Sequence, residues 1–243
     1  MRILLIAACL PLLGACHASW DHDGASRHDG KLSGVAASRS YDATGFTAID
    51  LRGSDDVDVK VGGAFSVKAE GDSKLLEELE ITVTNGTLRI SRKGNSHWNW
   101  GDHDGIRIHV TMPALSGATV SGSGDLDVDK VSGDFKGAVA GSGNLTVAAV
   151  AGGNVDLAIG GSGDLKVSGT ASQLSAAVAG SGDIDAKGMT ATSARVSVIG
   201  SGNVTGTVKG DADISITGSG DVDLGGAAKC KVSTIGSGEA HCG

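Results

Sequence analysis

The chain of 243 residues has few of the side chains that usually fill a wide globular core. It contains three Trp, three Phe, one Tyr and only two Pro, against 40 Gly. Collagen is excluded because the glycines follow no three-residue period and proline is scarce. A disordered chain of low complexity is disfavoured because apolar residues alternate regularly along much of the sequence. We therefore expect a narrow core of Val, Ile, Leu and Ala.

Basic clusters and catalytic motifs are also missing. The net charge is −8 and the Lys and Arg residues are scattered, so nucleic acid and anionic membrane surfaces are not expected partners. The sequence shows no carboxylate cluster like that of sugar-cleaving β-helix enzymes, no nucleophile elbow and no phosphate-binding loop. We therefore predict no catalytic residues, and the charge suits cations or neutral glycans better as ligands.

A short apolar run marks the N-terminus as an export signal. Residues 3–13 follow the positive start Met1-Arg2 and are too few to span a bilayer as a helix. The run ends in Leu13-Gly14-Ala15-Cys16, which resembles the bacterial lipobox, in which the Cys is acylated and becomes the first mature residue. We therefore expect a signal peptide over residues 1–15 and lipidation of Cys16. The alternative is ordinary cleavage near Ala18.

Acylation of Cys16 would hold the protein on a membrane without spanning it. His17, rather than Asp, follows the Cys, and bacterial sorting then favours the outer membrane. Residues 16–40 are mostly polar and are typical of a flexible tether. The prediction is an exported, lipid-anchored protein of the periplasm or cell surface.

A tetrapeptide recurs seven times in the second half of the chain, at offsets of 19, 20, 19, 20, 18 and 18 residues. Such even spacing is typical of a solenoid in which each copy belongs to one coil. Gly permits a positive φ and close approach of neighbouring backbones, so each Gly-Ser-Gly is expected to form a corner. The copies are Gly122-Ser123-Gly124-Asp125, Gly141-Ser142-Gly143-Asn144, Gly161-Ser162-Gly163-Asp164, Gly180-Ser181-Gly182-Asp183, Gly200-Ser201-Gly202-Asn203, Gly218-Ser219-Gly220-Asp221 and Gly236-Ser237-Gly238-Glu239.

Apolar residues alternate on both sides of each corner, which is the period of a β-strand. We predict an all-β fold, a parallel β-helix or β-solenoid with coils of about 19 residues, over residues 41–243. Residues 116–243 form its regular part. Residues 41–115 are less regular, with a degenerate copy at Gly53-Ser54-Asp55-Asp56, one helical turn over residues 74–79 and a hairpin at Asn85-Gly86. This part is expected to cap the N-terminal end of the solenoid, where sheet edges would otherwise be exposed.

Three segments resemble a known bacterial family. They are residues 46–51, the Asn85-Gly86 hairpin with residues 106–113, and the Gly-Ser-Gly-Asp array. Together they are similar to the head GIN domain family of putative auto-transporter adhesins, over about residues 45–240. The resemblance implies a β-helical secreted or surface domain, often behind a lipoprotein signal, with no established catalytic residues to carry over.

The residue after each corner forms a column of mostly acidic side chains, expected about 4.8 Å apart. Neighbouring carboxylates repel at that distance, and calcium could compensate them. The spacing does not match the calcium-binding nonapeptide repeat, so we favour residues that bond to backbone amides at the turn, with solvated charges interrupted by Asn. The column comprises Asp125, Asn144, Asp164, Asp183, Asn203, Asp221 and Glu239.

Two further candidate sites stand out. Cys230 and Cys242 fall at the inward positions of Ala212 and Leu224 in the repeat, so we expect a disulfide in the last coil. Closing this loop of about 13 residues could contribute about 3 kcal/mol. The alternative is two buried free thiols, and no metal site is predicted there.

The second candidate is an unusual loop, residues 96–104. Its Trp rings could stack on a sugar, and its His and Asp side chains could hold a divalent cation. The alternative is that the rings cover the end of the solenoid. The candidate ligand residues are His97, Trp98, Trp100, Asp102, His103 and Asp104.

The sequence as a whole predicts a lipid-anchored, non-catalytic module of the cell envelope for adhesion or glycan binding, without a required cofactor. Its expected partners are the membrane, through the lipid, and envelope or extracellular glycans. The alternative is a structural or envelope-stress spacer without a specific small ligand.

Overall fold

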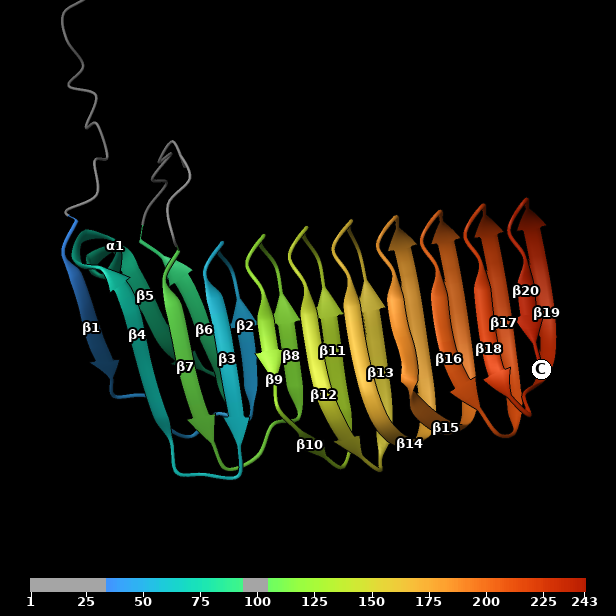
Figure 1. Ribbon diagram of the computed structural model, residues 1–243, viewed down its shortest axis with the longest axis horizontal. Coiled ribbons are helices and arrows are strands. Elements are labelled where there is room, and N and C mark those ends of the chain that lie inside the picture. Colours follow the sequence, from blue (N-terminus) through green and yellow to red (C-terminus); the bar gives the residue numbers. More distant parts are fainter. Residues whose placement is uncertain (1–33, 94–104) are drawn as a thin grey trace, which may run out of the picture. The chain divides into compact units, whose positions relative to one another are not determined.

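The computed structural model describes residues 34–93 and 105–243. They form an all-β solenoid of about 7 turns with coils of about 19 residues, which confirms the predicted fold class (Figure 1). The first elements are β1 (Ala36–Tyr41), β2 (Ala48–Leu51), β3 (Asp56–Val61), β4 (Ser66–Asp72), α1 (Ser73–Glu78), β5 (Leu79–Thr84), β6 (Thr87–Arg92) and β7 (Arg107–Met112). The coils continue with β8 (Gly117–Val120), β9 (Leu126–Val128), β10 (Val131–Ser132), β11 (Phe135–Val139), β12 (Leu145–Ala151), β13 (Asn154–Ile159), β14 (Leu165–Gly180) and β15 (Ile184–Gly200). The last strands are β16 (Val204–Val208), β17 (Asp211–Gly218), β18 (Val222–Gly226), β19 (Lys229–Gly236) and β20 (Ala240–Cys242).

Each coil contributes strands to two stacks, which the corners connect. We call stack 1 the series β5, β6, β2, β8, β11, β13, β14, β15, β17 and β19. Stack 2 is the series β1, β4, β7, β3, β9, β12, β14, β15, β16, β18 and β20. Strands β14 and β15 are long enough to take part in both. Pairing from β2 and β3 onward is parallel, because successive coils run in the same direction.

The core lies between the two stacks and is built by alternation. In β13, Val155, Leu157 and Ile159 are at most 2 % exposed, while the residues between them face solvent. Their register partners in β14 are Leu174, Ala176 and Val178, which are buried as well. Columns of small and branched apolar side chains therefore continue from coil to coil, so few aromatic residues are needed.

An insertion between β3 and β8 forms the N-terminal cap. Its strand β6 pairs with β2 in stack 1, and β7 pairs with β3 in stack 2, so neither first-coil strand is an edge. The hairpin joining β5 and β6 turns at Asn85 and Gly86, both with positive φ, as the Asn-Gly signal predicts. Helix α1 begins after Asp72, which caps it by accepting from the Lys74 backbone N–H. The insertion thus closes the end that the irregular sequence was expected to cap.

Candidate functional site

The Gly-Ser-Gly corners stack backbone on backbone. In each regular corner the first Gly carbonyl accepts two N–H groups of the next coil; Gly122, for example, accepts from Ser142 at 3.0 Å and Gly143 at 3.1 Å. A Cβ on Gly143 would lie 2.0 Å from the Gly124 carbonyl oxygen. Glycine is therefore required because the neighbouring coil occupies the place of a side chain.

The acidic column beside the corners is a hydrogen-bonded ladder. Asp125 Oδ1 accepts from the Asn144 backbone N–H at 3.0 Å and from its side-chain amide at 2.9 Å. Asn144 Oδ1 accepts from the backbone of Asp164 one coil further on. The same bond recurs through Asp183, Asn203, Asp221 and Glu239 at 2.7–2.9 Å. Each side-chain oxygen thus accepts a hydrogen bond from the next coil and not from its own turn. Backbone N–H groups contact these carboxylates, for which calcium was the alternative ligand.

The polar row next to the ladder lies on the outer face of stack 2. Asp127, Thr146 and Lys166 are register partners on successive coils. Together with Asp125, Asn144 and Asp164 they line a hollow of about 300 Å³. Lys166 Nζ also lies 4.0 Å from an Asp185 carboxylate oxygen. The hollow offers carboxylates, an amide, a hydroxyl and an ammonium group, which suits a hydroxyl-rich ligand. Within residues 34–93 and 105–243, no group of three or more His, Cys, Asp or Glu is placed to hold a metal ion.

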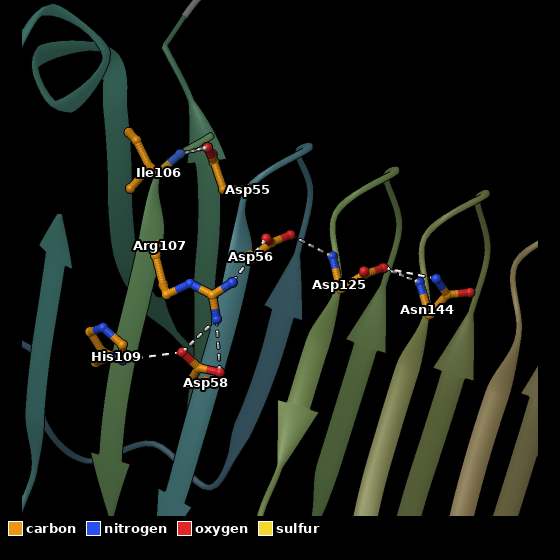
Figure 2. A network of polar contacts seen from close by, with 8 residues as sticks. All are labelled: Asp55, Asp56, Asp58, Ile106, Arg107, His109, Asp125 and Asn144. Atoms are coloured by element: carbon orange, nitrogen blue, oxygen red, sulfur yellow. Dashed lines mark hydrogen bonds and ion pairs between the residues drawn. The ribbon is translucent and has the colours of Figure 1, made fainter. Parts of the chain in front are cut away.

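The ladder continues into the cap through an ionic network (Figure 2). The Asp125 backbone N–H donates to Asp56, whose carboxylate lies 3.6 Å from Arg107. Arg107 donates to Asp58 at 3.1 Å, and His109 lies 3.2 Å from the same carboxylate. The hydrogen bond to Asp58 raises the pKa of Arg107 above its ordinary value. The outer face of stack 2 is therefore charged from the cap to the first coils.

Asp55 is a buried charged residue whose structural role was not expected from the sequence. Its side chain is 1 % exposed, forms an ion pair with Arg92 and accepts from the Ile106 backbone N–H. Arg92 and Ile106 lie on either side of residues 94–104, so one buried carboxylate holds both flanks of the candidate Trp loop. The signal was the degenerate first corner, where Asp55 stands at the position of the second Gly.

The other candidate residues divide between the last coil and undescribed parts of the chain. Cys230 on β19 and Cys242 on β20 are joined in a disulfide, with their Cα atoms 6.3 Å apart. They stand in register with the inward residues Ala212 and Leu224, but in this terminal coil Cys230 is half-buried and Cys242 is exposed. Cys16 and the loop residues His97, Trp98, Trp100, Asp102, His103 and Asp104 lie outside the described residues. In the described part of the chain, no helix is both long and apolar enough to cross a membrane.

The family of the chain follows from a match that covers most of the solenoid. The model of the family "Putative auto-transporter adhesin, head GIN domain" matches residues 45–228. The chain belongs to this family. The assignment confirms the resemblance carried by the hairpin and the Gly-Ser-Gly-Asp array, and it includes both the cap insertion and the regular coils of this head GIN domain.

Solved structures share the fold of this head GIN domain. A putative adhesin from Bacteroides fragilis superposes with a TM-score of 0.82 at 21% identity, covering 87% of this chain and 98% of that one. A putative lipid binding protein from Parabacteroides distasonis gives 0.70 at 24% identity, and a putative adhesin from the same species gives 0.68 at 19%, with the same coverage. Among curated proteins, none matches this chain. These identities establish the solenoid architecture and no ligand.

Proposed function

We propose that this head GIN domain protein is a non-catalytic adhesion module of the cell envelope, exported and held at a membrane by lipidated Cys16, which binds extended glycans. The family supports adhesion, since its name describes adhesins. The observation that carries the glycan proposal is the pair of polar rows on the outer face of stack 2. They repeat with the coil spacing and enclose the hollow between Asp125 and Lys166.

An extended polymer suits such a face better than a compact ligand does. Parallel strands repeat about every 4.8 Å, so polar positions recur at that spacing along the solenoid. Asp127, Thr146 and Lys166 present three different polar groups within three coils. The Trp98 and Trp100 rings, whose loop flanks are held by Asp55, would add stacking on sugar rings to these hydrogen bonds.

A spacer is the second candidate function, and the ladder favours it. One oxygen of each ladder side chain from Asp125 to Asp221 already bonds to the next coil, which stiffens the solenoid and leaves fewer acceptors for a ligand. Under this alternative the polar rows serve solubility and stacking, and the chain acts as a rigid rod.

Binding of glycans and envelope polymers decides between the two functions. The test uses the mature chain, residues 16–243, with Cys16→Ser, screened with calcium and with a chelator. We expect saturable binding that is lost in Asp127→Ala/Lys166→Ala or in Trp98→Ala/Trp100→Ala. Lys209→Ala/Asp211→Ala, which changes the same residue types away from both polar rows, is expected to bind normally. Absence of binding under both conditions would establish the spacer instead.

A further inference from the structure

The last four strands of stack 1 are β14, β15, β17 and β19. Their outer face differs from the outer face of stack 2. Two of the large apolar side chains that the described residues expose lie on this face, Ile199 on β15 and Ile235 on β19, with exposed fractions of 58% and 70%. Val232 is also exposed, but it stands in register with buried Ile214, at an inward position of the last coil. A hollow of about 320 Å³ lies over the same strands, lined by Arg195, Asp213, Lys231 and neighbouring residues. Exposed apolar side chains around a hollow are typical of a contact surface.

The register arranges three rows across the strands of this face, beside a further row that ends in Asp211 and Lys229. The charged row is Ser175, Arg195, Asp213 and Lys231. The small row is Ala177, Ser197, Ser215 and Ser233. The apolar row is Ala179, Ile199, Thr217 and Ile235. Small residues in the middle row allow another surface to approach closely.

The charges of the first row have no partner among the residues that the structure describes. Arg195, Asp213 and Lys231 are exposed and occupy neighbouring strands in register. Among residues 34–93 and 105–243, none of their side chains forms a hydrogen bond or an ion pair within 4.0 Å. The row thus presents a positive, a negative and a positive group to whatever covers it.

A second copy of the chain is complementary to these rows. A two-fold axis parallel to the strands, placed between β15 and β17, lays each row on itself in reverse order. Arg195 then faces Asp213 of the second copy, and Asp213 faces Arg195 of the second copy. Lys231 faces Ser175 of the second copy, so no like charges oppose each other directly.

The sizes of the apolar row match in the same arrangement. Ile235 faces Ala179 of the second copy, and Ile199 faces Thr217 of the second copy. Each large side chain therefore meets a smaller one, while Ser197 and Ser215 meet across the axis. The charged row and the apolar row are therefore both complementary to themselves about the same two-fold axis.

We propose that the outer face of β14, β15, β17 and β19 is a self-association surface that pairs two chains with antiparallel solenoid axes. Four strands with about five residues each cover roughly 300 Å² per copy, well below the about 800 Å² per partner of a standard interface. A single pair is therefore weak, and many copies on one surface are needed for strong attachment.

Antiparallel axes place the N-terminal ends of the two solenoids at opposite ends of the pair. If each chain is anchored through Cys16, which rests on the proposed function, the paired chains come from two opposed membranes. Self-association would then be an adhesion mechanism of its own, in addition to glycan binding.

Aggregation of protein-coated beads tests the surface without lipid or glycan. The mature chain, residues 16–243, carries Cys16→Ser and an N-terminal biotin and is coupled to streptavidin beads. Wild-type beads are expected to aggregate. Beads with Arg195→Asp and beads with Asp213→Arg should each aggregate at least about tenfold less, because two repulsive pairs replace two attractive ones. Mixing the two variant populations should restore aggregation, since each negative pair then faces a positive pair.

Two control variants separate this register from net charge. Lys209→Asp and Asp223→Arg make the same charge changes away from the three rows, and each is expected to aggregate like wild type. Circular dichroism checks that every variant is folded. Dispersed wild-type beads, unaffected single variants, failure of the mixture to aggregate, or controls that behave like the test pair would each overturn the proposal. Because no glycan is present, failure of glycan binding leaves the outcome unchanged.

Discussion

Gly143 stands against Gly124 of the preceding coil, and this contact decides which residue the corner accepts. A Cβ at position 143 would lie 2.0 Å from the Gly124 carbonyl oxygen. We predict that Gly143→Ala lowers the free energy of unfolding by about 3 kcal/mol, because the coils must separate and weaken their hydrogen bonds. Gly160→Ala is the matched control, since nothing lies within 4 Å of a Cβ there. Urea denaturation measures both, and equal losses would contradict the steric explanation.

Asp55 shows where the requirement for Gly at a corner ends. It lies in the degenerate first corner and carries a side chain at the position where later copies need Gly. We predict that Asp55→Ala costs about 3–5 kcal/mol of stability, because the guanidinium of Arg92 and the Ile106 N–H lose their buried partner. Asp58→Ala removes an exposed partner of Arg107 and should cost at most about 1 kcal/mol. Thermal and urea unfolding test the difference, and similar losses would argue against a buried ion pair.

Between elements, the ladder joins strands that are one coil apart in sequence. Asp183 Oδ1 accepts from both the backbone N–H and the side-chain amide of Asn203. We predict that Asp183→Ala lowers stability by about 1 kcal/mol, because those donors lose their acceptor. Asp183→Asn keeps an acceptor, as Asn144 does for Asp164, and should remain within about 0.5 kcal/mol of wild type. If Asp183→Asn lowered the free energy of unfolding in urea as much as Asp183→Ala, the negative charge and not the acceptor oxygen would be what stabilises the ladder.

For the molecule as a whole, the stacked coils make stability a sum of similar units. Deleting residues 164–182 joins Gly163 to Asp183 and removes one complete coil in register. We predict a folded protein with a lower unfolding midpoint and a smaller denaturant slope, measured by circular dichroism in urea.

Deleting residues 62–115 instead exposes the edges of β2 and β3 and should cause aggregation, measured by size-exclusion chromatography. A variant lacking residues 62–115 that elutes without aggregates would show that the cap is dispensable.

The sequence alone determined the solenoid, its coil length, the inward columns and the Asn85-Gly86 hairpin. These features depend on local alternation and on a repeat that can be counted, so one chain suffices to recognise them. Contacts between coils were decided only by the tertiary structure. The ladder acceptors serve residues 18–20 positions away, Asp55 meets Arg92 across the cap, and Arg195 stands beside Asp213. The physical reason is that coils of unequal length can stack in several registers, and core packing selects the one that aligns the corners.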